Sequence, residues 1–187
     1  TCALPICEDV LVSGAGPIGM MAARVARFCG ARHIVVTDIK PYRLELARTL
    51  EPTIHTINVD EISIQEEMQQ LGMTEGFDVA MEMSGAESAV NATIAAMKNG
   101  GEIALLGTHG REAKVDWNQI IYKSLTVQGV YGREMFETWY KMMAMVEAGL
   151  DLTPIITHRF DFRDYEAGFA AMNSGNSGKV ILDWSQI

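Results

Sequence analysis

The segment that most constrains this sequence is Gly14-Ala15-Gly16-Pro17-Ile18-Gly19, which lies between an expected strand and an expected helix. The run from Glu8 to Ser13 (EDVLVS) is typical of a buried strand, and Pro17 to Cys29 carries apolar residues at helical spacing. A strand that turns tightly into a helix is typical of a β-α-β unit, because parallel neighbouring strands need a long crossover connection. The sequence therefore predicts an α/β domain built on a parallel sheet.

Each glycine of this turn has a physical task in a dinucleotide-binding site. Gly14 permits the tight turn, Gly16 lets the backbone approach a pyrophosphate, and Gly19 lets the helix and the strand pack closely. The free N–H groups and the positive end of the helix then stabilise the phosphates. A methyl-donor site with a similar turn, or a plain glycine turn without a ligand, is the alternative.

An acidic residue at the end of the next expected strand favours the dinucleotide. Asp38 ends the run from His33 (HIVVTD) and lies 19 residues beyond Gly19, close to the expected spacing of about 20. Its carboxylate is suited to accept hydrogen bonds from the adenosine ribose hydroxyls and repels a 2′-phosphate, so NAD is favoured over NADP. Lys40 and Arg43 weaken this preference unless they pair with Asp38 or cover the adenine.

The rest of the chain continues the alternation of strands and helices. Right-handed crossovers between such elements produce a doubly wound, six-stranded parallel sheet of the Rossmann type. The further strands are expected at residues 54–59, 77–83, 102–106 and 125–131, and the further helices at residues 41–50, 62–71, 87–97 and 134–148.

The residues after about Leu152 form a second, smaller part. Pro154 marks a boundary, so we expect an NAD-binding domain over residues 1–152 and a C-terminal segment over residues 153–187. This segment is predicted to be a β-α-β appendage, with strands at residues 155–160 and 179–184 around a helix at residues 162–172.

In an open parallel sheet, ligands also contact the loops at the carboxyl ends of other strands. Leu106-Gly107-Thr108 follows the fifth expected strand, and Val130-Tyr131-Gly132 follows the sixth. Both segments can approach the nicotinamide end of a dinucleotide through backbone groups. Ordinary turn glycines explain them equally well, and the residues alone leave the two interpretations open.

Charge and composition exclude several classes of function. The chain has 24 acidic and 15 basic residues and a net charge of −9, which opposes binding to nucleic acid or to an anionic membrane. No apolar run approaches the roughly 20 residues of a membrane span. Cys2, Cys7 and Cys29 form no Cys-x-x-Cys pair and indicate reduced thiols in a cytoplasmic protein.

The sequence offers no metal site or catalytic motif. Glu82 and Glu102 are isolated strand residues, so a catalytic carboxylate pair is not indicated. The four histidines have no metal-ligand spacing with one another or with the cysteines; they are His33, His55, His109 and His158.

Longer segments identify a family. The chain resembles the zinc-dependent medium-chain alcohol dehydrogenases in GAGPIG, TDIKPYRLELAR, LGMTEGFDVAMEMSGA, VYGREMFETWYKM and SGKVIL, and the similarity covers essentially all 187 residues. The resemblance implies an oxidoreductase of threonine breakdown, which oxidises the 3-hydroxyl of L-threonine to 2-amino-3-ketobutyrate and passes hydride to NAD. It places cofactor contacts at Ile18, Asp38, Arg43, Leu106, Gly107, Thr108, Val130 and Tyr131.

The chain departs from the family in one respect. Family members carry a preceding catalytic domain with the catalytic zinc ligands, a structural zinc site built on cysteines and a proton relay. Because the chain begins at Thr1, just before the first expected strand, we expect a processed or truncated N-terminus. The zinc ligands, the catalytic residues and most of the L-threonine site are then expected outside this chain.

The resemblance also bears on assembly. It implies that the C-terminal segment packs on the catalytic domain and that the enzyme is a homo-oligomer, a tetramer. Two alternatives stay open at this point: the NAD-binding domain of a related polyol or alcohol dehydrogenase, and a non-catalytic NAD-binding module.

Overall fold

The computed structural model describes residues 7–110, 112–132 and 134–185. Its main body is a six-stranded sheet with the strand order β3-β2-β1-β4-β5-β6, in which all neighbouring strands are parallel. This order is that of the doubly wound Rossmann arrangement and confirms the predicted fold class. The strands are β1 (Val10–Ser13), β2 (Ile34–Asp38), β3 (His55–Asn58), β4 (Phe77–Glu82), β5 (Met97–Leu105) and β6 (Thr126–Gly129).

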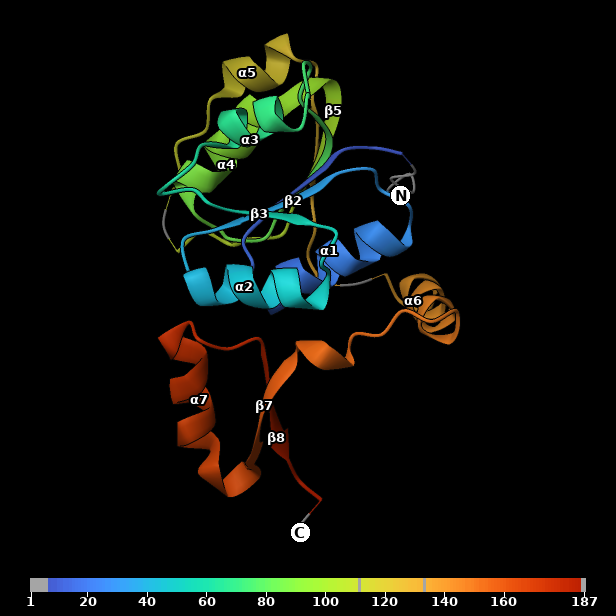
Figure 1. Cartoon of the computed structure of the whole chain (residues 1–187), viewed down its shortest axis with the longest axis vertical. Helices are drawn as coiled ribbons and strands as arrows, with labels where there is room; N and C mark the ends of the chain where they lie inside the picture. Colours follow the sequence, from blue (N-terminus) through green and yellow to red (C-terminus); the bar gives the residue numbers. More distant parts are fainter. Residues whose placement is uncertain (1–6, 111, 133, 186–187) are drawn as a thin grey trace.

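Helices cover both faces of the sheet (Figure 1). One face carries α1 (Pro17–Phe28) and α2 (Pro41–Leu50), and the other carries α3 (Ile64–Gln70), α4 (Glu87–Ala96) and α5 (Trp117–Tyr122). Successive residues of β1 point to opposite faces, so Val12 joins the apolar cluster under α1 while Leu11 joins the cluster under α4. Burial on both faces explains why β1 and β2 each begin with three consecutive apolar residues.

The structure differs from the expected elements mainly in short or exposed segments. Helix α5 was not predicted, because its six residues are too few to show a helical period. Asp116 begins this helix by accepting hydrogen bonds from the N–H groups of Asn118 and Gln119, as N-cap aspartates do. The helix expected over residues 134–148 is α6 (Glu137–Glu147).

The C-terminal residues form the predicted β-α-β unit. Strands β7 (Ile156–Asp161) and β8 (Lys179–Asp183) are parallel and are joined through α7 (Tyr165–Ser174). The short 3-10 helix Thr153–Ile155 leads into β7, and Ile155, 1% exposed, is buried in the same apolar cluster as Val12. This unit therefore lies against the helical face formed by α1 and α2 (Figure 1).

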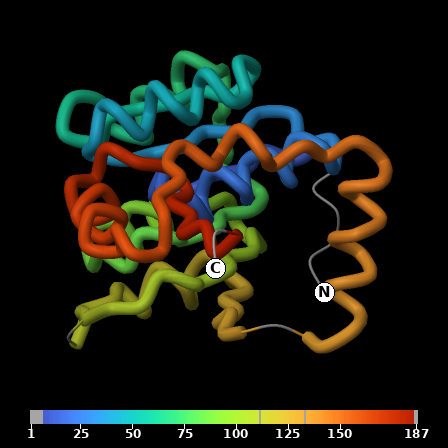
Figure 2. Tube along the Cα trace, turned by 90° about the horizontal axis from the view of Figure 1, so that it is seen from below, coloured from blue at the N-terminus to red at the C-terminus, as the bar shows by residue number. Residues whose placement is uncertain are grey.

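Helix α6 stands at the side of the molecule. All of its residues are described, and they are exposed except for the half-buried Met145. Figure 2 shows the helix on the opposite side from the C-terminal unit. Within the described ranges, no helix is long and apolar enough to cross a membrane.

Candidate functional site

The glycine turn connects the carboxyl end of β1 to α1. Gly14 has a φ of 100°, in the left-handed region that favours glycine. A Cβ at Gly19 would lie 1.8 Å from the carbonyl oxygen of Gly14, so a larger residue there would push the turn away. A Cβ at Gly16, in contrast, would meet no heavy atom of the described residues within 4 Å. The fold itself thus requires Gly14 and Gly19, whereas Gly16 presents an open backbone surface.

The N-terminus of α1 faces this open surface without a side-chain cap. Gly16 is the N-cap residue and Pro17 the first residue of the helix, and no described side chain caps the helix. The unpaired N–H groups and the positive end of a helix of 12 residues attract an anion. Ile18, 47% exposed, lies in the first turn beside them.

Asp38 ties the end of β2 to the glycine turn. Its Oδ2 accepts a hydrogen bond from the N–H of Ala15 at 2.8 Å, and its Oδ1 accepts from Ile39 at 2.8 Å and Lys40 at 2.9 Å. An ionised carboxylate has about four acceptor positions. One position on Oδ2 therefore remains for another donor, such as a ligand hydroxyl.

Arg43 lies beside Asp38 but does not use that position. Its Nη1 is 3.9 Å from Oδ2 of Asp38, which is an ion pair rather than a hydrogen bond. The Nε of Arg43 is buried without a hydrogen-bond partner among the described residues. The structure thus shows a loose pairing of Arg43 with Asp38.

The loops after β4 and β5 are in backbone contact. The N–H groups of Leu106 and Gly107 both donate to the carbonyl oxygen of Glu82 at 3.0 Å. A Cβ at Gly107 would lie 2.2 Å from the nitrogen of Gly85, and a Cβ at Gly85 would lie 2.6 Å from the carbonyl oxygen of Thr108. Glycine is therefore needed at both positions for the two loops to approach.

The loop after β6 joins the same edge through its backbone. The N–H of Val130 donates to the carbonyl oxygen of Leu105 at 2.8 Å. Val130 is 38% exposed, whereas Tyr131 is 98% exposed. The structure thus brings the Val130 backbone to the edge and leaves the Tyr131 side chain almost wholly in solvent.

These contacts link the chain segments at the carboxyl ends of five neighbouring strands, β2, β1, β4, β5 and β6. The loops after neighbouring strands meet in the pairs Asp38–Ala15, Gly14–Ser84, Gly85–Thr108 and Leu105–Val130. Residue patterns did not reveal the contribution of Glu82 and the Ser84-Gly85 turn. The available signal was a carboxylate inside the apolar run FDVAMEM, directly before a Ser-Gly turn.

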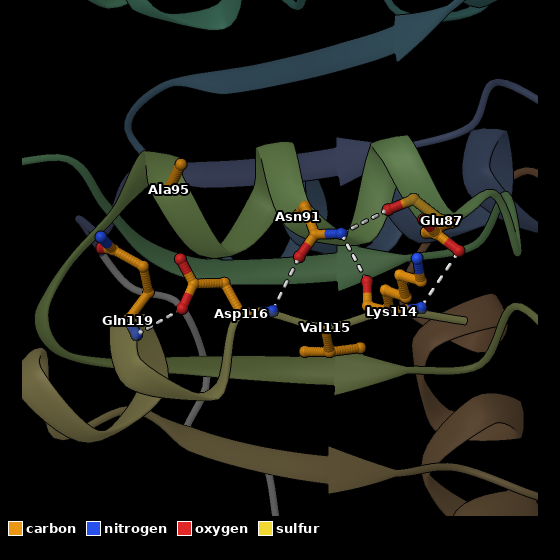
Figure 3. A pocket seen from close by; sticks show the side chains of 7 residues that line it. All are labelled: Glu87, Asn91, Ala95, Lys114, Val115, Asp116 and Gln119. Atoms are coloured by element: carbon orange, nitrogen blue, oxygen red, sulfur yellow. Dashed lines mark hydrogen bonds between the residues drawn. The ribbon is translucent and has the colours of Figure 1, made fainter. Parts of the chain in front are cut away.

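Two hollows lie near α4, and neither contains the glycine turn. The larger hollow, of about 680 Å³, is lined by Gly85 and His109 among others, and Nδ1 of His109 lies 2.7 Å from the carbonyl oxygen of Gly85. The other, of about 470 Å³, is drawn in Figure 3. There the polar groups bond to one another, since Asn91 bonds the backbones of Lys114 and Asp116. The hydrogen bonds across this second hollow hold residues 114–116 against α4.

The described residues do not form a metal centre. Among them, no group of three His, Cys, Asp or Glu side chains is placed to hold a metal ion. Cys7 and Cys29 are free thiols, and burial raises the pKa of Cys29. Cys2 lies outside the described residues.

Comparison with known families shows which family this chain belongs to. The family model described as "Zinc-binding dehydrogenase" matches residues 17–148, a range that includes the whole sheet after β1. The chain belongs to the zinc-binding dehydrogenase family. This match confirms the family resemblance found in the sequence. The Rossmann strand order of this zinc-binding dehydrogenase chain is consistent with the same family.

Curated relatives include the L-threonine 3-dehydrogenases of Burkholderia ambifaria and Colwellia psychrerythraea. The protein of Burkholderia ambifaria is 60% identical over 178 residues, which cover 95% of this chain and 52% of the relative. That of Colwellia psychrerythraea is 57% identical over 178 residues, with the same coverage of 95% and 52%. The chain therefore spans about half the length of the curated relatives it matches.

Solved structures share the fold. The 2R,3R-butanediol dehydrogenase of Bacillus subtilis matches with a TM-score of 0.85 and 22% identity, over 96% of this chain and 52% of that chain. A short chain alcohol dehydrogenase from E. coli CFT073, complexed with the cofactor NADH, has a TM-score of 0.84 and 22% identity, over 96% of this chain and 53% of that chain. At this identity the likeness shows the architecture alone.

Proposed function

We propose that the carboxyl edge of this sheet binds NAD(H) and that the chain is the cofactor-binding part of an L-threonine 3-dehydrogenase. The observation that carries the binding site is the open backbone at Gly16, at the uncapped start of α1 and linked through Ala15 to Asp38. Identity of 60% to an L-threonine 3-dehydrogenase over 95% of the chain supports the substrate.

Different residues at the carboxyl edge of the sheet contact different parts of the cofactor in this proposal. The pyrophosphate fits against Gly16 and the start of α1, where N–H groups and the helix dipole stabilise negative charge. Asp38 accepts from a ribose hydroxyl at its remaining position, and its charge repels a 2′-phosphate, so NAD is preferred over NADP. The segments 106–108 and 130–131 border the nicotinamide end.

In the proposed reaction, this chain orients the nicotinamide of the cofactor and does not itself supply the reacting groups. Bound NAD supplies the acceptor for the hydride that leaves the substrate carbon. The described residues do not fit a zinc site, so we assign no step through zinc to them. Their part is to hold the nicotinamide at a fixed place on the edge of the sheet.

Self-association is supported by the outer strand of the sheet. β6 ends the strand order, and all four of its residues are exposed. An edge strand with unpaired N–H and C=O groups is a template for pairing with another chain. We propose that the protein is a homo-oligomer, a tetramer by resemblance; light scattering that finds only monomers of the intact protein refutes this.

Calorimetric titration of this chain with NADH and NADPH tests the cofactor. NADH is expected to saturate one site, with NADPH weaker, and equal or tighter binding of NADPH refutes the role of Asp38. The intact protein with zinc is expected to form NADH from L-threonine. Turnover of polyols or simple alcohols with none of L-threonine refutes the substrate, and cofactor binding without any turnover favours a non-catalytic module.

A further inference from the structure

We propose that Glu82 is a positioning residue, whose buried carboxylate holds the loops after β4 and β5 in the arrangement that receives the nicotinamide half of the cofactor. The inference rests on the proposed NAD binding. Glu82 itself is 0% exposed, so it acts through the loops and not by touching the ligand.

The position of Glu82 is central. It is the last residue of β4, and it pairs with Ser13 of β1 on one side and with Leu105 of β5 on the other. These two neighbours end the strands from which the glycine turn and the loop at Leu106 begin. Glu82 therefore lies between the strand that leads into the glycine turn and the strand that leads into the loop at Leu106.

The side chain and the main chain of Glu82 hold different loops. Its Oε1 accepts hydrogen bonds from the N–H of Ser84 at 2.9 Å and of Gly85 at 3.1 Å, and from the Ser84 hydroxyl. Its carbonyl oxygen accepts from Leu106 and Gly107 at 3.0 Å each. One residue thus fastens the loop after β4 to the start of the loop after β5.

The space around this carboxylate leaves little freedom for either loop. A Cβ at Gly107 would lie 2.4 Å from Oε2 of Glu82 and 2.2 Å from the nitrogen of Gly85. A Cβ at Gly14 would lie 3.1 Å from the nitrogen of Ser84. The Ser84-Gly85 turn is therefore wedged between the glycine turn and the loop after β5, and its displacement moves the loop at Gly107.

A carboxylate is a costly way to fill this buried space. Desolvation of an ionised group is unfavourable unless hydrogen bonds compensate it, and an apolar side chain would avoid that cost. The rest of the core around β4 does use apolar side chains, such as Phe77 and Ala80. What the carboxylate adds is direction, because its charged acceptors fix the N–H groups of the turn.

Glu82→Gln tests the role with little change of shape. One carboxylate oxygen becomes an NH2 donor, which faces the N–H of Gly85 or lies against Gly107. The remaining hydrogen bonds are then made to a neutral amide oxygen instead of a charged carboxylate. The Ser84-Gly85 turn is then held less firmly, because hydrogen bonds to a neutral acceptor are weaker than those to a charged one, so the Kd for NADH is expected to rise about tenfold or more. The Kd for ADP, which lacks the nicotinamide half, is expected to change less than about twofold, since the glycine turn and Asp38 stay in place.

Asp9→Asn is the matched control. Asp9 is also buried, 3% exposed, and its carboxylate accepts hydrogen bonds from Arg32. It lies just before β1, at the opposite, amino edge of the sheet. The control is expected to lower stability while the Kd values for NADH and ADP stay within about twofold of the original chain, as for a residue remote from the site.

Titration and amide hydrogen exchange on the same variants separate the outcomes. In Glu82→Gln, exchange is expected to rise at residues 84–85 and 106–107 but not along β2. If the original chain binds NADH and Glu82→Gln binds it equally well, the positioning role is wrong while the proposed function stands. Equal losses for NADH and ADP also overturn it, because they indicate general damage to the fold. If the original chain binds no NADH, the proposed function itself fails and this role fails with it.

Ser84→Ala keeps the proposal testable if Glu82→Gln does not fold. It removes the hydroxyl that donates to Glu82 and accepts from the N–H of Ala86, and it leaves the bonds from the N–H groups of Ser84 and Gly85 to Glu82 in place. We expect the same pattern at smaller size, a rise of about threefold in the Kd for NADH without a change for ADP, since only one of the hydrogen bonds to Glu82 is lost. Unchanged binding of NADH by a folded Ser84→Ala refutes the proposal.

Discussion

Gly16→Val separates the fold from the cofactor site at a single residue. Gly16 has φ −70° and ψ 178°, an extended conformation that any residue adopts, and a Cβ there meets no described atom within 4 Å. We expect the stability of the variant to lie within about 1 kcal/mol of the original, which is roughly 2–4 °C in Tm for a chain of this size. The branched side chain nevertheless fills the space through which a pyrophosphate reaches the backbone.

The loss of affinity follows from the blocked contacts. If two N–H bonds to a charged phosphate are lost, at about 1.5–3 kcal/mol each, the Kd for NADH rises by more than about a hundredfold. Titration with NADH and thermal unfolding measure the two effects separately. Unchanged affinity in a folded Gly16→Val shows that the phosphates do not sit at this turn.

Gly19→Ala is the matched control for this variant. Its Cβ would lie 1.8 Å from the carbonyl oxygen of Gly14, so the turn or the helix must move. Overpacking of this kind costs about 1–3 kcal/mol, which predicts a clear drop in Tm. A Gly19→Ala chain as stable as the original contradicts the packing derived for this turn.

Three further outcomes follow from the same structure. Asp38→Ala is expected to bring the Kd values for NADH and NADPH closer together, because the ribose acceptor and the repelling charge both disappear; titration with both cofactors checks this. Without the rest of the enzyme, this chain is expected to form no NADH from L-threonine and to retain no stoichiometric zinc after dialysis, and turnover like that of an intact dehydrogenase refutes the proposed division of labour. Burial alone would raise the pKa of the Asp78 carboxyl. Hydrogen bonds from the N–H of Asp9 and from Lys98 outweigh this effect and leave that pKa below its usual value. Its contribution to stability is therefore full above about pH 4 and is lost as the pH falls through the lowered pKa. Urea unfolding from pH 6 to pH 2 is expected to show a shallower loss for Asp78→Asn, and identical slopes contradict this.

Local spacing accounts for the parts of this protein that residue patterns predicted. The glycine turn, the apolar runs of β1 and β2 and the acid at Asp38 lie close along the chain and obey short-range steric rules. A residue such as Gly19 must be small because Gly14, five positions earlier, comes back against it. The alternation of strands and helices in turn limits the chain to a parallel, doubly wound sheet.

The remaining features depend on which strands become neighbours. Glu82 reads as an isolated strand residue, since its partners Leu106 and Gly107 reach it only when β4 and β5 pair. The exposure of Tyr131 and the loose pairing of Arg43 with Asp38 depend in the same way on packing around each side chain. Contacts between distant segments are determined by the strand order and the close packing of the loops, and no period along the chain encodes them.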